Sequence, residues 1–166
     1  MGKLKVTEIS TPTDTGSITI PSGVTFAPSG HIIQVVSTSD NTSFNTSSTS
    51  FTAVTNLSVD ITPSSSSSKI FVTVSGQMYQ QFAAKYSIAT IYRDTTDLGA
   101  SSSKGLTNIY SNPNDAGVPL AMAILDSPST TSEITYQIYV RTTSGGTTYI
   151  NENSPKTTIT AMEIAG

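Results

Sequence analysis

At 166 residues the chain fits one globular domain, and a domain of that length can bury a sizeable core. Charged residues are only 11% of the chain, the formal net charge is −3 and the eight Lys and Arg residues are scattered singly, which excludes the electrostatic footprint of nucleic-acid binding. The chain has no cysteine, which excludes disulfides and thiolate chemistry, and we expect no signal peptide and no membrane insertion because no window is long and apolar enough.

Residues 1–30 consist of very short apolar segments separated by proline and glycine turns. Strands are expected around 4–9, 17–20 and 24–27. Segments of this length cannot bury much surface alone, so they must pack against the main domain or against equivalent segments of other chains. We therefore predict an N-terminal attachment or stem segment at 1–30, followed by a β-sandwich domain at 31–166.

From His31 onward the expected strands become longer. The apolar run at 32–36 predicts a strand that is covered on both faces. The polar tract at 37–50 is expected to form a long exposed loop or a weak hairpin, and the five serines at 64–68 predict a flexible connection. A second long loop is expected at 100–116, holding one short strand. Further strands are expected at 57–61, 69–75, 85–93, 108–110 and 119–125.

The clearest strand pattern of the chain lies at 133–141. Apolar and aromatic residues alternate there with mostly polar ones, which is typical of a half-buried antiparallel strand and excludes a helix. The residues expected on the buried side are Ile134, Tyr136, Ile138 and Val140.

Two adjacent glycines follow this strand. Gly145 and Gly146 can supply the positive φ angles of a tight hairpin turn, so a return strand is expected at 147–151. After a second turn at 153–155, a last strand is expected at 157–164. Because both of its sides carry apolar residues, we expect it to be central in a sheet or at a subunit interface.

The spacing of these signals predicts the fold class. Turn signals recur about every 8–12 residues, and no window shows a sustained helical period. The prediction is an all-β protein, an antiparallel β-sandwich of seven to nine strands. A jelly-roll-like order is favoured slightly over an immunoglobulin-like order, because the usual cysteine and tryptophan core markers are missing.

Candidate catalytic and metal-binding residues are few. The one histidine, His31, could join a serine triad, but no G-x-S-x-G motif is present and a plain histidine at a strand edge is favoured. Asp94 and Asp97 suggest a calcium site or a glycosidase pair, yet the calcium-loop spacing is absent and acids in turns usually cap their own backbone. The same reasoning applies to Asp126, Glu152 and Asn153. We predict no enzymatic activity, no cofactor and no metal.

Aromatic residues offer the remaining candidate for binding. Tyr79, Phe82, Tyr86 and Tyr92 could form a carbohydrate-stacking surface, although packing in the core or at an interface is favoured. The tract at 77–82 carries large amphipathic side chains outside a clean strand pattern, a composition typical of interfaces. The predicted contact surface comprises Phe44, Gln77, Met78, Tyr79, Gln80, Phe82 and Tyr110.

Several stretches give the chain a family resemblance that spans nearly its whole length. They are KLKV at 3–6, SITIPSG at 17–23, SSSSKIFV at 65–72, DSP-x-TTS-x-ITY at 126–136, GGTTYIN at 145–151 and TITAMEI at 158–164. With them the sequence resembles the small fibre-like virion structural proteins of tailed phages, especially marine phages and those that infect cyanobacteria. That family is defined by architecture and position in the virion, so no catalytic residue can be carried over from it.

The resemblance implies a trimeric β-structured appendage, a tail or head fibre or its knob, located in a virion that is assembled in the host cytoplasm. The short N-terminal segments and the apolar last strand also favour a homotrimer, with residues 1–30 joining other virion proteins. The loops at 38–50 and 100–117 are rich in hydroxyl and amide groups, and we expect them to bind a host-surface glycan or an outer-membrane component. The alternative is a capsid decoration (cement) protein that stabilises the head shell.

Overall fold

The computed structural model describes residues 29–166 except 83, 100–103 and 113, so the predicted attachment segment lies outside the described residues apart from its last two positions. All the regular secondary structure within the described ranges is β-strand. The strands are β1 (Ile32–Asp40), β2 (Phe44–Thr46), β3 (Thr52–Ile61), β4 (Lys69–Gln81), β5 (Lys85–Arg93), β6 (Thr96–Asp97), β7 (Thr107–Ser111), β8 (Ala116–Asp126), β9 (Ile134–Thr142), β10 (Thr147–Ile150) and β11 (Thr157–Ile164).

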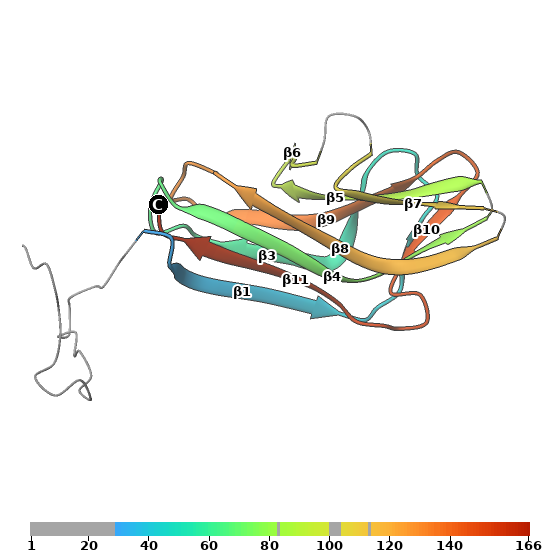
Figure 1. The fold of residues 1–166 in the computed structure, drawn as a ribbon, viewed down its shortest axis with the longest axis horizontal. Helices are drawn as coiled ribbons and strands as arrows, with labels where there is room; N and C mark the ends of the chain where they lie inside the picture. The colour runs from blue at the N-terminus through green and yellow to red at the C-terminus, as the bar shows by residue number, and fades with distance from the viewer. Residues whose placement is uncertain (1–28, 83, 100–103, 113) are drawn as a thin grey trace, which may run out of the picture.

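The strands form two antiparallel sheets that pack face to face (Figure 1). Sheet A is built on the long strand β4, which pairs with β8 along one edge and with β11 and then β10 along the other. β1 pairs with the free edge of β11, and β2 pairs with the free edge of β10. In sheet B the order is β3-β9-β5, and β7 and β6 share the far edge of β5.

The resulting orders, β1-β11-β4-β8 in sheet A and β3-β9-β5-β7 in sheet B, are those of a jelly roll. The predicted all-β, antiparallel, jelly-roll-like sandwich is therefore confirmed. The number of strands exceeds the prediction because β2, β6 and β10 are short pieces that continue the edge or the pairing of a longer strand.

The inner faces of both sheets supply one apolar core. β9 follows its predicted pattern, since its alternate residues from Ile134 to Val140 are all buried. At one end of the core the phenol of Tyr136 donates a hydrogen bond to Asp126, whose carboxylate also forms an ion pair with Arg93 at 2.7 Å. Burial and the hydrogen bond to Asp126 raise the pKa of Tyr136.

The first long strand differs from its prediction. β1 pairs only with β11 among the described strands, so it lies at the edge of sheet A. Ile32 and Val35 are 55% and 56% exposed instead of covered. The prediction was wrong because an apolar run has the same pattern whether its outer face meets protein or solvent. The tract at 37–50 is only partly loop, since β1 runs to Asp40 and β2 follows.

The turn at Gly145 and Gly146 does not make a hairpin. β9 lies in sheet B and β10 in sheet A, so the turn carries the chain from one sheet to the other. Gly145 has the predicted positive φ, 77°, whereas Gly146 is needed for space because an added Cβ would collide with the hydroxyl of Thr142. The local signal showed that the chain turns, but the partner of the next strand is decided by distant residues.

The last strand takes its predicted place. β11 lies between β1 and β4 in sheet A. One side, which includes Ile159 and Ala161, faces the core, and the other side, which includes Met162 and Ile164, is partly exposed. A central position is thus confirmed, and no described strand covers the outer side.

Candidate binding surfaces

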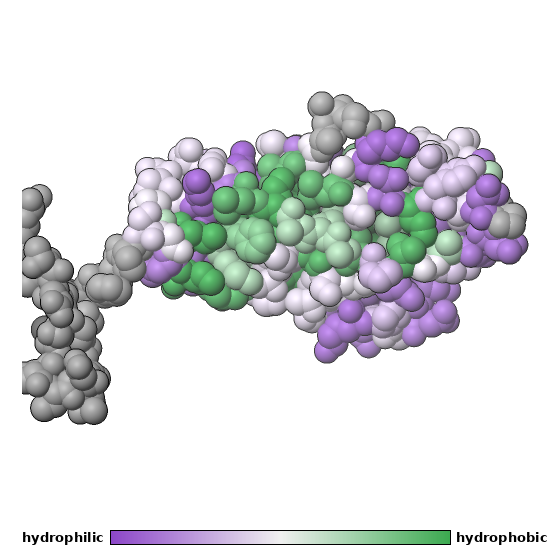
Figure 2. Space-filling model, viewed as in Figure 1, coloured by the Kyte–Doolittle hydropathy of each residue, from purple (hydrophilic) through white to green (hydrophobic). Residues whose placement is uncertain are grey.

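An apolar surface forms on the outer side of sheet A, because residues in register on neighbouring strands point the same way. Val35 of β1 is paired with Met162 of β11, Met162 with Phe71 of β4, and Phe71 with Leu125 of β8. We call this surface the apolar face. Its members are Ile32, Val35, Phe71, Leu125, Met162 and Ile164. Figure 2 shows apolar residues gathered on the half of the molecule nearer the N-terminal end of β1.

Away from that end, the same side of sheet A becomes polar. The hydroxyl of Ser37 bonds that of Thr160 at 3.0 Å, and the hydroxyl of Ser39 bonds that of Thr158 at 2.8 Å. These pairs continue the strand registers that build the apolar face. The apolar face therefore has a neutral, hydroxylated border.

The opposite end of the sandwich, which we call the distal end, carries exposed aromatic residues. Phe82 follows β4 with φ 74° and is 51% exposed. Its backbone is fixed by two bonds, since its N–H donates to Asp115 at 2.7 Å and its carbonyl accepts from the Ser111 hydroxyl at 2.7 Å. Non-glycine residues with positive φ cluster at binding sites, where the surrounding structure must maintain them.

A second aromatic group lies beside this turn on β5 and β7. The rings of Tyr86 and Tyr110 are 4.7 Å apart between centroids, and Tyr110 is 47% exposed. The Lys104 ammonium lies 3.8 Å from the centre of the Tyr86 ring, within the range of a cation–π contact. Together with Phe82 these residues give the distal end aromatic surface and a positive charge among hydroxylated loops.

The outer side of sheet B holds a further aromatic group. Tyr92 and Tyr139 stack with centroids 4.0 Å apart, Phe51 meets Tyr92 edge-on at 6.1 Å, and the Arg141 guanidinium lies 5.3 Å from the Phe51 ring. All four side chains are partly buried. Burial, followed by the nearby charge of Asp97, raises the pKa of Tyr92.

The four aromatic residues considered as one sugar-stacking surface do not form one. Tyr79 lies on sheet A, where it meets Tyr149 edge-on at 5.8 Å, while Tyr86 and Tyr92 lie on sheet B. Residues that are close in the sequence lie in different sheets, because strand pairing decides the sheet and a local sequence pattern does not reveal the pairing.

The predicted contact residues are divided by the structure. Met78 and Gln80 are buried, with 1% and 0% of their surface exposed, so their assignment to a contact surface was wrong. β4 continues to Gln81, and its alternation turns these two side chains into the sandwich. Phe44 packs against the core. Gln77 and Tyr79 lie partly exposed on the outer side of sheet A, and Phe82 and Tyr110 are exposed at the distal end.

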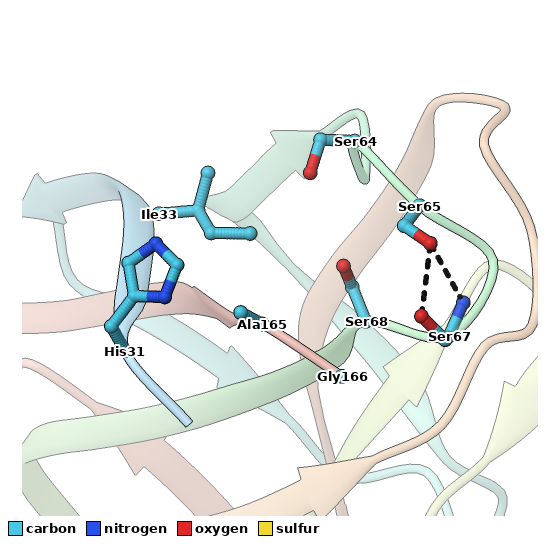
Figure 3. A pocket seen from close by; sticks show the side chains of 8 residues that line it. All are labelled: His31, Ile33, Ser64, Ser65, Ser67, Ser68, Ala165 and Gly166. Carbon is cyan, nitrogen blue, oxygen red and sulfur yellow. Dashed lines mark hydrogen bonds between the residues drawn. The ribbon is translucent and has the colours of Figure 1, made fainter. Parts of the chain in front are cut away.

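One pocket, of about 360 Å³, lies beside the N-terminal end of β1 (Figure 3). His31 and Ile33 line one side, and serines of the connection at 64–68 line the other. The hydroxyls of Ser65 and Ser67 bond each other at 2.9 Å. The serine tract predicted to be flexible thus adopts a defined turn, because its hydroxyls bond within it.

A buried carboxylate underlies this turn. Glu163 is 0% exposed; its Oε1 accepts from the Ser64 N–H at 2.7 Å and hydroxyl at 2.6 Å, and its Oε2 accepts from the Gln34 amide at 2.6 Å. Burial raises the pKa of this carboxyl, but the hydrogen bonds from Ser64 and Gln34 outweigh burial and leave the pKa below its usual value. Both carboxylate oxygens therefore connect β1, β11 and the serine turn.

Of the two turn acids, Asp97 caps its own backbone, as predicted, whereas Asp94 bonds the backbone of β9. Asp97 accepts from the N–H of Gly99 at 2.8 Å and from the Thr90 hydroxyl at 2.6 Å. Asp94 accepts from the N–H of Thr135 at 3.0 Å. In the part of the chain that the structure describes, no three His, Cys, Asp or Glu residues gather in a way that could hold a metal ion. No helix in that part is long and apolar enough to cross a membrane.

No protein-family model and no curated protein sequence matches the chain. Among solved structures, the chain is similar to a structure of the infectious bursal disease virus Gx strain, with 15% identity, a TM-score of 0.41 and coverage of 90% of this chain and 42% of that one. A mutant VP2 protein of the same virus, from T=1 particles, gives 15% identity, a TM-score of 0.38 and coverage of 90% and 41%. The chain spans less than half the length of these neighbours, and the fold assignment rests on its own strand order.

Proposed function

We propose that the chain is a non-enzymatic structural protein of a phage virion, a homotrimeric fibre or knob appendage that binds the host cell surface. The resemblance of the sequence to fibre-like virion proteins supports its place in a virion. The observation that best supports an appendage is that the two ends of the sandwich have different surfaces.

The two ends differ in chemistry and in their relation to the chain. The N–H of Gly30 donates to the carbonyl of Ala165 at 2.8 Å, so the described chain begins beside the end of the last strand and the apolar face. The C-terminal ends of β4 and β7 lie at the other end of the sandwich (Figure 1). Phe82, which follows β4, and Tyr110 of β7 are both exposed. A protein that attaches by its N-terminal end and presents its distal end to a ligand requires this arrangement.

The distal end suits a neutral, hydroxylated ligand. Aromatic rings supply rigid apolar contact, and neighbouring hydroxyl and amide groups supply adaptable hydrogen bonds. A single site of this kind binds weakly. Three copies on one axis raise the effective concentration, so avidity can exceed single-site affinity by roughly 10² or more. The proposed ligand is a surface glycan or an outer-membrane component of the host.

The test is binding of the purified protein to host cells and its competition with phage adsorption. The parent chain should bind cells and slow adsorption. Phe82→Ala and Tyr110→Ala should weaken both effects, because each removes an exposed ring. Glu133→Ala, at an exposed position away from the distal end, is the matched control and should behave as the parent.

The same experiment separates the appendage from the capsid decoration protein. A chain that fails to bind cells but binds empty capsids tightly would contradict the appendage and support the decoration protein. Cell binding that survives both ring-removing substitutions would contradict the assignment of the distal end.

A further inference from the structure

The apolar face leaves a continuous group of apolar side chains exposed. Its three most exposed members, Ile32, Val35 and Leu125, each leave more than half of their surface open. With the three partly exposed members they leave a patch on the order of a few hundred Å², and the largest apolar patch of a soluble protein is often functional.

The composition of the face fits a contact with an identical surface. Lys69, paired with Ile164, is the charged residue that borders the apolar rows. The surrounding groups are the neutral hydroxyl pairs, such as Ser37 with Thr160. Because the face carries little charge, copies of it would not repel one another, whereas a basic or acidic partner would find no complementary charge.

The edge of sheet A next to this face is also open. β1 is nine residues long, pairs only with β11 among the described strands, and contains no proline and no lysine. Natural edge strands usually carry such residues, or a bulge, to prevent pairing with another chain. The one irregularity of β1 lies at its start, between Ile32 and Gln34, and leaves the rest of the edge regular.

The size of the face agrees with a stable interface between copies. A standard interface buries about 800 Å² on each partner, and its centre is about 65% apolar. The apolar face supplies an apolar centre of that order, and the hydroxyl pairs and the open edge of β1 supply a polar border.

We infer that the apolar face and the adjoining edge of β1 form the contact between copies of this chain. The inference rests on the homotrimer proposed above and assigns a surface to it. Copies that turn this face toward a common axis cover their patches against one another and leave the distal ends free for a ligand.

The test measures the mass of the full-length protein by light scattering between 1 and 100 μM, an interval of the order at which specific interfaces form. Val35→Glu and Leu125→Glu place a charge at two open positions on different strands, so both variants should fold and should be monomers. Phe82→Glu changes a side chain of similar exposure at the distal end and should keep the parental mass. Circular dichroism of each variant checks that the sheet is intact.

Each outcome decides a separate point. An oligomeric parent with folded monomeric Val35→Glu and Leu125→Glu variants supports the inference. If both variants keep the parental mass, the inference is wrong and the trimer must use another surface. A monomeric parent overturns the inference and the trimer together, but a monomer that binds host cells through Phe82 leaves the rest of the proposed function standing.

Discussion

Single polar residues inside the sandwich connect segments that are far apart in the sequence. Asn151 is fully buried, and its amide donates to the carbonyls of Asp40 and Thr42 at 3.0 and 3.3 Å. Its side-chain oxygen accepts from the Thr157 hydroxyl at 2.6 Å. The sequence indicated a turn near these residues, but it did not indicate that the turn binds the end of β1.

Replacing Asn151 should separate backbone strain from lost hydrogen bonds. Asn151 has φ 58°, a conformation that asparagine tolerates and alanine does not. Asn151→Ala should therefore lower the free energy of unfolding by about 2–4 kcal/mol, from unpaired buried groups and strain together. Asn151→Gly loses the same bonds without the strain and should cost clearly less. Urea denaturation measures both, and equal losses would contradict a contribution from strain.

The phenol of Tyr136 should make stability depend on alkaline pH. Its pKa is raised in the folded state, so its contribution is complete below the unfolded value of 10.0 and is lost as the pH rises through the folded value. Tyr136→Phe removes this dependence and also the hydrogen bond to Asp126, at a cost of about 1–3 kcal/mol at pH 7. Between pH 8 and pH 12 the free energy of unfolding should fall more steeply for the parent than for the variant. Parallel curves would argue against the buried phenol.

At the scale of strands, sequence patterns predicted the buried side where only one face of a strand meets the core. They failed where the pairing of distant strands decides how far a strand extends. The alternation in β9 predicted its buried side, because one face of that strand meets the core and the other does not. β4 was predicted to end near Ser75, but it continues to Gln81 with a change of partner from β11 to β10. This continuation buries Met78 and Gln80, and it depends on residues about 70 positions further along the chain.

Gly76 lies where β4 changes partner, and the change depends on its lack of a side chain. An added Cβ would overlap the side chain of Thr157, the first residue of β11. Gly76→Ala should lower the free energy of unfolding by about 1–3 kcal/mol through overpacking. Gly117→Ala is the matched control, because its Cβ would meet the Tyr79 ring at an ordinary 3.4 Å, and it should change stability by less than about 0.5 kcal/mol. Equal effects in thermal unfolding would contradict the steric argument.

The N-terminal segment provides a further prediction at this scale. The described domain has its own core and strand set from β1 onward, so a chain without residues 1–30 should keep its sheet signal in circular dichroism. The same chain should no longer join the particle, because the proposed attachment element is missing. Normal incorporation of the truncated chain, measured by particle purification and immunoblotting, would show that another surface attaches the protein.

At the scale of the whole molecule, the jelly roll separates two surfaces that the sequence showed only as composition. Exposed and partly exposed apolar residues of β1, β4, β8 and β11 lie together on the outer side of sheet A, and the exposed aromatic residues lie at the distal end. Periodicity could predict the sandwich, since the alternation of apolar and polar residues within each strand indicates its buried face. It could not predict these surfaces, since each combines residues from strands that pair across most of the chain.

The position of the protein on the particle tests the central proposal most directly. Electron microscopy of phage particles carrying a label fused to the C-terminus of this chain would show it. The appendage predicts label on a protruding fibre or knob, in groups of three copies. Label spread evenly over the head shell would contradict the appendage in favour of a decoration protein, and purified particles without label would contradict a virion protein altogether.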